Sequence, residues 1–323
     1  MKRWIIRCLS ILAGLLLFAA CAAGCDFSLK CKLAYFVNDD EKSCTIIGLG
    51  NFTGTELVIP SEIDGYAVTD IDSHAFQDCD DLVSVTLPKG VTSIENSTFW
   101  NCDNLKSVII PDSVKTVRAC AFWDCTSLTS VEIPDSVESL GNYAFSGCSN
   151  LTSVKMGNSV KSIGNYAFEN CARLTNVTLP DSVQSIGDYA FYYCTDLANV
   201  TLPHSVQSIG DYAFYYCTNL ANVKIGNGAK SIGDYAFYRC NNLTSTLIGD
   251  SVERIGTGAF YDCSGLMNVY YRGSANTWAH IYIEKDNTCL TTAIRYDYSG
   301  IQPTDDGRYW HYVDGEPTPW NRF

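Results

Sequence analysis

Hydrophobic and polar positions recur along this chain with a fixed period of 23 residues. Each unit follows the approximate pattern A-F-x-x-C-x-x-L-x-x-V-x-[LI]-P-x-S-V-x-S-I-G-[DN]-Y. Two sets of residues keep the period without a gap: Phe76, Phe99, Phe122, Phe145, Phe168, Phe191, Phe214, Phe237 and Phe260, and Cys79, Cys102, Cys125, Cys148, Cys171, Cys194, Cys217, Cys240 and Cys263. Such a period predicts a repeat architecture in which each unit packs against its neighbours.

The unit contains one short strand and one returning loop. In residues 177–179 the Val-Thr-Leu alternation has the period of a strand, and Pro180 ends it by withholding a backbone donor. Val183 and Ile186 are expected to point inward, and Gly187 to permit a tight turn that a Cβ would resist. Because one coil cannot bury its own apolar face, the sequence predicts stacked coils with a parallel sheet and a cap at each end.

The segment 185–191, with the sequence S-I-G-D-Y-A-F, together with Pro180, Cys194 and Leu197, resembles the leucine-rich repeats of the BspA-like surface proteins of bacteria and some protists. The resemblance covers roughly residues 56–298. It implies a leucine-rich-repeat solenoid of about ten coils, with a curved parallel β-sheet on one side and short helical turns and loops on the other. It also implies an N-terminal cap over residues 25–55 and a C-terminal tail over residues 299–323.

The first residues indicate export. Lys2, Arg3 and Arg7 precede an apolar run that ends in small residues, which is typical of a secretory leader over residues 1–24. Cys21 and Cys25 each follow two small residues, and both sites resemble the lipobox of bacterial lipoproteins; the sequence leaves open which cysteine is acylated, if either is. We therefore expect a protein that is either lipid-anchored at the cell surface or secreted, with membrane contact only through the leader or a lipid.

Charge narrows the choice of partners. The chain carries 22 Lys and Arg against 35 Asp and Glu, which gives a net charge of −13. An acidic surface repels phosphate backbones, so the composition argues against a nucleic-acid partner.

The cysteines are predicted to be core residues. Nine of the 16 recur once per unit, whereas a structural zinc site needs ligands that converge on one point. Stacked rungs also present parallel Cβ vectors, which do not suit a disulfide. Outside the ladder, Cys31 and Cys44 are the most favourable disulfide pair, and the pairing of Cys120 and Cys289 stays open.

The sequence offers no catalytic site, and we expect neither an enzyme nor a cofactor. The four histidines, His74, His204, His280 and His311, fall in different units and none repeats. A cysteine or serine nucleophile needs a base within hydrogen-bond reach, and the scattered aspartates lack the spacing of a calcium loop. His74 and His204 are expected to be plain surface residues.

Two surfaces remain as candidates for ligand binding. On the outward face of the predicted sheet, small polar residues can accept an extended protein or a glycan; the candidates there are Glu132, Lys155, Thr178, Thr201 and Lys224. On one flank, large aromatics follow the ladder Phe: Trp100, Trp123, Tyr192, Tyr193, Tyr215, Tyr216, Tyr238 and Tyr261. If these rings are partly exposed, they form an aromatic strip suited to binding. If they pack against neighbouring coils, they belong to the core. The sequence leaves both alternatives open.

These features lead to two hypotheses for function. The resemblance to BspA-like proteins implies adhesion, through the solenoid surface, to a protein of the host matrix or of a cell surface. The aromatic flank motivates the alternative, a glycan-binding protein for carbohydrate capture.

Overall fold

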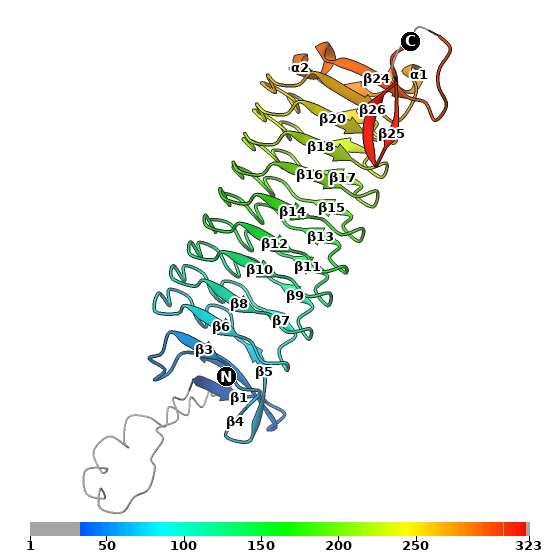
Figure 1. The fold of residues 1–323 in the computed structure, drawn as a ribbon. Coiled ribbons are helices and arrows are strands. Elements are labelled where there is room, and N and C mark those ends of the chain that lie inside the picture. Colours follow the sequence, from blue (N-terminus) through cyan, green and yellow to red (C-terminus); the bar gives the residue numbers. More distant parts are fainter. Residues whose placement is uncertain (1–32, 306, 321–323) are drawn as a thin grey trace, which may run out of the picture.

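The computed structural model describes residues 33–305 and 307–320. They form a rod of stacked coils with an N-terminal cap at one end and additional strands at the other (Figure 1). Strand partners in neighbouring coils are 23 residues apart, so that Ser130 lies opposite Ser153 and Ser153 opposite Asn176. The predicted repeat solenoid with parallel strands is confirmed.

The longest strands of the coils form one side of the rod, which we call the wide sheet. Its first part has three strands, β3 (Glu56–Val58), β6 (Ser84–Thr86) and β8 (Ser107–Ile109). Its second part continues with β10 (Ser130–Glu132), β12 (Ser153–Lys155), β14 (Asn176–Thr178), β16 (Asn199–Leu202), β18 (Asn222–Ile225), β20 (Ser245–Ile248), β22 (Asn268–Tyr271) and β24 (Ile294–Tyr298). In most of these strands the inward residue, such as Val154, is buried and its neighbours are exposed or half-buried; in β20 and β22 the outward residues Leu247 and Tyr270 are buried as well.

A second parallel sheet, which the sequence did not predict, is made of two-residue strands; we call it the narrow sheet. Its members are β7 (Ser93–Ile94), β9 (Thr116–Val117), β11 (Ser139–Leu140), β13 (Ser162–Ile163), β15 (Ser185–Ile186), β17 (Ser208–Ile209), β19 (Ser231–Ile232), β21 (Arg254–Ile255) and β23 (Tyr282–Ile283). Two residues are too few to show alternation, so the pattern gave no strand signal. The remaining side consists of turns, and α1 (Ala275–Trp278) and α2 (Thr288–Thr292) both follow the last repeat.

The interior consists of the predicted ladders. Ring centroids of successive ladder phenylalanines lie 5.1 to 5.4 Å apart, and all nine rings are fully buried. The described cysteines are free thiols. Cys194 is typical of the ladder: its thiol donates to the carbonyl of Phe168 at 3.1 Å, and burial raises its pKa well above the usual value. The ladder cysteines are therefore packed core groups, as predicted, and only Cys79 in the first coil is half-buried.

The corner glycine has a different role from the predicted one. Gly187 lies outside the left-handed region of backbone space, but a Cβ added to it would come within 2.7 Å of the backbone of the preceding coil. Glycine is thus needed for the close approach of coils rather than for a positive φ. The positive φ falls instead on Tyr189, at 57°, and on Tyr193, at 59°.

The N-terminal cap is a four-stranded sheet in the order β1 (Ala34–Val37), β2 (Ser43–Gly48), β5 (Tyr66–Ile71) and β4 (Glu62–Ile63). The cap sheet thus extends past residue 55, although β3 already belongs to the wide sheet. Cys44 on β2 is a fully buried free thiol in the core. Cys31, its predicted disulfide partner, lies outside the described residues.

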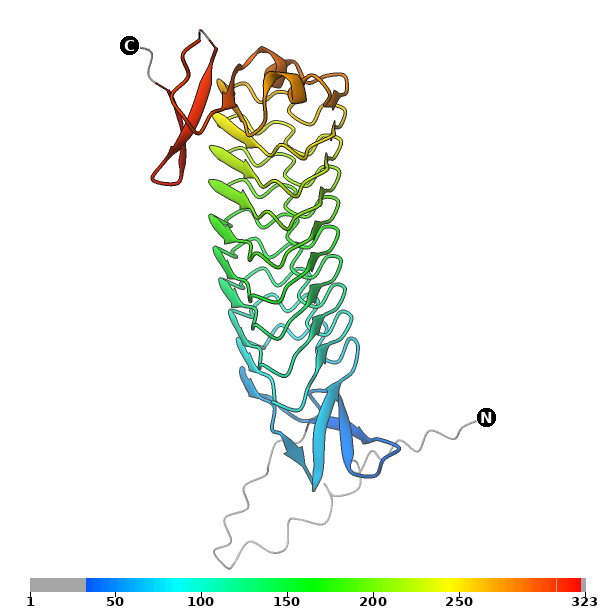
Figure 2. The same ribbon diagram turned by 90° about the vertical axis from the view of Figure 1, so that its right-hand side faces the viewer.

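The C-terminal tail forms a hairpin of β25 (Tyr309–Val313) and β26 (Glu316–Pro319). β25 pairs with β24, and the hairpin, at the red end of the chain, lies along the side of the rod next to the last coils (Figure 2). It packs on the wide sheet: Trp310 is fully buried and clusters with Leu247 and Tyr270. The tail is therefore packed on the solenoid.

The predicted leader and the lipidation candidates Cys21 and Cys25 lie outside the described residues. Within the described part of the chain, no helix has the length and apolar character needed to cross a bilayer.

Candidate functional site

The outward face of the wide sheet, which we call the strand face, carries the first set of predicted residues. Glu132, Lys155, Thr178 and Thr201 are exposed at successive rungs of one column, and Lys224 is half-buried farther along it. Lys155 forms an ion pair with Glu132. The structure thus brings these residues into one line, and their role in binding stays a prediction.

Two adjoining hollows lie on the strand face, one over β10, β12 and β14 and the other where the wide sheet is interrupted between β8 and β10. Their volumes are about 520 and 840 Å³, and Glu132, Lys155 and Met156 line both. Farther toward the N-terminus, the same column presents two apolar side chains to solvent, Val58 at 69% and Ile109 at 61% exposure. Thr86 lies between them in the column, so two exposed apolar side chains alternate with a polar one beside the Glu132–Lys155 pair.

The other end of the strand face is covered by the C-terminal hairpin. Leu247 and Tyr270 occupy the outward column but are only 7% and 8% exposed, because Trp310 packs on them. The Trp310 indole N–H donates to the carbonyl of Tyr271 at 2.8 Å. At the hairpin tip, the Lys224 ammonium pairs with the Glu316 carboxylate at 2.7 Å, so Lys224 already has a partner within the chain.

The aromatic flank is both stacked and partly exposed. Trp100 and Trp123 stack with centroids 4.9 Å apart. A longer row of stacked rings, 4.5 to 5.3 Å apart, joins Tyr192, Tyr215, Tyr238 and Tyr261. Each ring in these rows covers the face of its neighbour, while its edge reaches the surface. Burial, together with the neighbouring phenols, raises the pKa of Tyr215 to about 12, so the hydroxyl of Tyr215 stays protonated.

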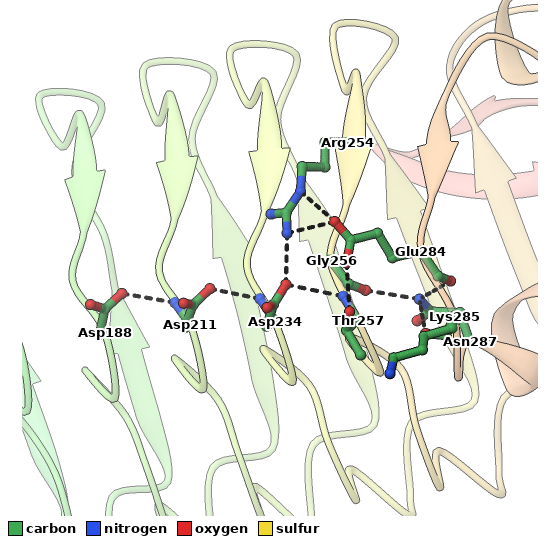
Figure 3. Close-up of polar contacts among 9 residues, drawn as sticks. All are labelled: Asp188, Asp211, Asp234, Arg254, Gly256, Thr257, Glu284, Lys285 and Asn287. Carbon is green, nitrogen blue, oxygen red and sulfur yellow. Dashed lines mark hydrogen bonds and ion pairs between the residues drawn. The ribbon is translucent and has the colours of Figure 1, made fainter.

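A row of carboxylate side chains, Asp188, Asp211 and Asp234, runs along successive coils (Figure 3). Asp188 accepts the backbone N–H of Asp211 at 2.9 Å, and Asp211 accepts that of Asp234 at 2.7 Å. Arg254 closes the row, because its guanidinium lies 2.8 Å from both Asp234 and Glu284. The hydrogen bond from Thr257 and, to a smaller extent, that from Arg254 hold the pKa of Glu284 below its usual value. Asn142 and Asn165 occupy the same position in earlier coils.

The row predicts that Asp211→Asn is at least neutral for stability. An amide oxygen keeps the bond from Asp234, and the substitution removes like charges one coil apart, which raises the free energy of unfolding by about 0.5 kcal/mol or less. Asp211→Ala removes the acceptor for the Asp234 N–H and lowers the free energy of unfolding by about 1 kcal/mol. Thermal unfolding of the three proteins checks the order; a less stable Asp211→Asn protein contradicts it.

Among residues 33–305 and 307–320, no group of three His, Cys, Asp or Glu side chains is placed to hold a metal ion. His74 is a surface residue, whereas the ring Nδ1 of His204 accepts the backbone N–H of Asn227 at 3.0 Å. His204 therefore bridges two coils, and the expectation of a plain surface residue was too simple.

Comparison with known proteins agrees with this geometry. The family model described as BspA type Leucine rich repeat region (6 copies) matches residues 69–198 and 184–285, which is more than half of the chain. The chain belongs to this family. No curated protein matches the BspA-type chain.

Solved structures of bacterial leucine-rich repeat proteins are similar to this BspA-type solenoid. A protein from Bacteroides ovatus is 27% identical with a TM-score of 0.57, over 84% of this chain and 79% of its own. The T. pallidum leucine-rich repeat protein is 31% identical with a TM-score of 0.51, over 65% and 87%. These relatives support a protein-interaction or adhesion role in general terms and name no ligand.

Two features of the BspA-type surface were missed by sequence reasoning. The carboxylate row was visible as the [DN] position of the repeat, but its bonds to the next coil depend on stacking. The hairpin had a local signal, Asp314-Gly315 between two aromatic or apolar runs, which is typical of a tight β-turn.

Proposed function

We propose that this protein is a non-catalytic recognition protein that binds a protein ligand through the strand face between β3 and β16. It acts at the cell surface, lipid-anchored, or after secretion; the basic, apolar and cysteine-containing N-terminal sequence supports this location. The family supports the general class, since repeat solenoids expose long surfaces for binding.

The observation that carries the proposal is the hairpin on the strand face. This face holds a polypeptide segment of the same chain, anchored by a buried tryptophan and a lysine–carboxylate pair. The uncovered part of the face offers the same kinds of group, the apolar side chains Val58 and Ile109 and the Glu132–Lys155 pair beside the two hollows. A buried aromatic anchor with a charged rim is the usual pattern of a protein interface.

Glycan capture is less well supported by the flank than the sequence suggested. Sugar rings stack on exposed aromatic faces, whereas the faces in the rows Trp100–Trp123 and Tyr192–Tyr261 are largely covered by neighbouring rings. The strand face is therefore the better-supported binding surface.

A double variant on the strand face and a charge-reversal control elsewhere on the rod test the proposal. Lys155 and Lys161 each pair with a glutamate one coil earlier, but only Lys155 lies on the strand face. We expect Ile109→Ser combined with Lys155→Glu to weaken binding to extracellular-matrix proteins, screened on an immobilised panel, by about tenfold or more, and Lys161→Glu to leave it unchanged. Equal affinities in all three proteins, or binding only to a parallel polysaccharide panel, contradict the proposal.

A further inference from the structure

Three consecutive coils carry nearly the same six residues, D-Y-A-F-Y-Y at 188–193 and 211–216 and D-Y-A-F-Y-R at 234–239. In each coil the Ala and Phe are buried and the other four side chains reach the surface. Rings in equivalent positions stack, for example Tyr189 on Tyr212 at 4.6 Å and Tyr193 on Tyr216 at 4.7 Å. We call this surface the tyrosine array; it lies on the turn side of the rod and is separate from the strand face.

The array contains residues that the fold does not require. Tyr193, Tyr216 and Arg239 have φ of 59°, 60° and 56°, in the left-handed region. The same position in the other six coils holds the residues that tolerate this region best: Asp78, Asn101, Asp124, Gly147, Asn170 and Asp262. Three successive coils thus place a tyrosine or arginine at a left-handed backbone position that favours Asp, Asn or Gly. Since unfavourable backbone conformations gather at functional sites, these side chains point to a binding role.

At one end of the array, the chain shows how these rings bind a cation. The Arg239 guanidinium lies 5.3 Å from the ring centre of Tyr216 and 5.4 Å from that of Tyr238. It hydrogen-bonds to the Tyr216 hydroxyl and forms an ion pair with Asp262 at 3.0 Å. Two ring faces and one carboxylate thus hold one guanidinium.

The opposite end of the array has the same groups without an internal cation. The residues one coil before Tyr192 and Tyr193 are Glu169 and Asn170, so no aromatic ring of the described residues stacks on that side of either tyrosine. Glu169 accepts a hydrogen bond from Ser146 at 3.1 Å but has no ion-pair partner within the described residues.

Charge at this end favours a positive group. Burial raises the pKa of Glu169; the hydrogen bond from Ser146 lowers it in part, and the nearby carboxylate of Asp124 raises it. Burial also raises the pKa of Asp124. A cation placed against these carboxylates offsets that cost, and the net charge of −13 attracts basic partners over longer distances.

We propose that the N-terminal end of the tyrosine array binds an arginine side chain of a partner protein, with the guanidinium stacked on Tyr193 beside Tyr192 and paired with Glu169. This site is independent of the strand face, so its failure leaves the function proposed above untouched. Arginine suits it better than lysine, since a planar guanidinium stacks on a ring while donating to a carboxylate, as Arg239 does at the other end.

The test uses a short peptide with two arginines and the same peptide with glutamines in their place. We expect the arginine peptide alone to bind the full chain at millimolar concentrations, measured by calorimetry. Tyr193→Asn, which introduces the residue that Asn170 already supplies at this backbone position, and Glu169→Gln, which keeps an acceptor for Ser146, should each weaken binding about fivefold.

Matched controls sit elsewhere on the rod. Tyr261→Asn makes the same chemical change at the end that Arg239 occupies, and Glu253→Gln removes an exposed carboxylate outside the array. Both should bind the peptide as well as the unchanged protein. Equal binding of the two peptides, no binding of the arginine peptide, or equal affinity across all variants overturns the proposal; the strand-face variant Lys155→Glu separates this result from the test of the proposed function.

Discussion

Replacement of Phe214 by alanine is expected to lower the free energy of unfolding by about 3–5 kcal/mol, which is typical of a fully buried phenylalanine. Its ring lies between those of Phe191 and Phe237, at 5.1 and 5.2 Å, and is 0% exposed. The substitution therefore removes two stacking contacts and leaves a cavity in the middle of the rod, where coils on both sides depend on it.

The position of Phe214 also predicts a change in cooperativity. Since each coil contacts only its neighbours, a defect in one coil weakens the coupling between the two halves of the solenoid. Thermal or urea unfolding should show a lower midpoint and a broader or divided transition. Tyr215→Ala is the control: this adjacent ring is half-buried, and its loss should cost less than half as much. Equal losses from the two variants would mean that the Phe ladder is not the main source of coupling.

The core was predictable because its signal is local and repeated. Phe, Cys, Leu and Val at fixed positions of a 23-residue unit can be buried together only if the units stack, so the ladders followed from the period alone. The narrow sheet was not predictable, since Ser185–Ile186 is too short to show a strand pattern. The left-handed tyrosines were also missed, because Gly187 in the same unit is the better candidate for such a conformation by its chemistry.

The candidate surfaces were predicted only in part. Exposure of Lys155 and Thr178 followed from the alternation of the strand, which decides the face on which each side chain lies. The exposure of the Tyr192 and Tyr215 rings could not be predicted from the sequence, since stacking covers the ring faces and leaves the edges exposed. Contacts of the tail with the strand face join residues as far apart as Lys224 and Glu316, and no periodic signal connects them.

The hairpin divides the strand face into a covered and an open part. Leu247 and Tyr270 extend the outward column beyond Lys224, and the hairpin, together with Tyr296 of β24, keeps them from solvent. The edge strand of the hairpin, β26, contains Pro317 and Pro319, which cannot donate to a further strand and so limit pairing with other chains. The open part of the face therefore ends at the hairpin.

Trp310→Ala should release this hairpin and leave the coils folded. Trp310 is fully buried, donates to the Tyr271 carbonyl and makes edge contacts with Tyr298 and Tyr312 at 5.0 and 4.9 Å. Its loss costs about 3–5 kcal/mol, which falls on docking of the hairpin because the ladders do not include it. Hydrogen exchange should accelerate over residues 309–319, while the thermal midpoint of the solenoid changes little.

Release of the hairpin should also lengthen the open part of the strand face. Leu247 and Tyr270 then become exposed next to Lys224, and an apolar patch of this kind promotes association with other proteins or with a second copy of the chain. Light scattering and the matrix-protein panel measure both outcomes. Trp320→Ala is the control, since that ring is half-buried, stacks on His311 and donates to the Ser299 carbonyl at the rim. Unchanged exchange over β25 in Trp310→Ala, or equal effects of the two tryptophans, would show that Trp310 does not anchor the hairpin to the strand face.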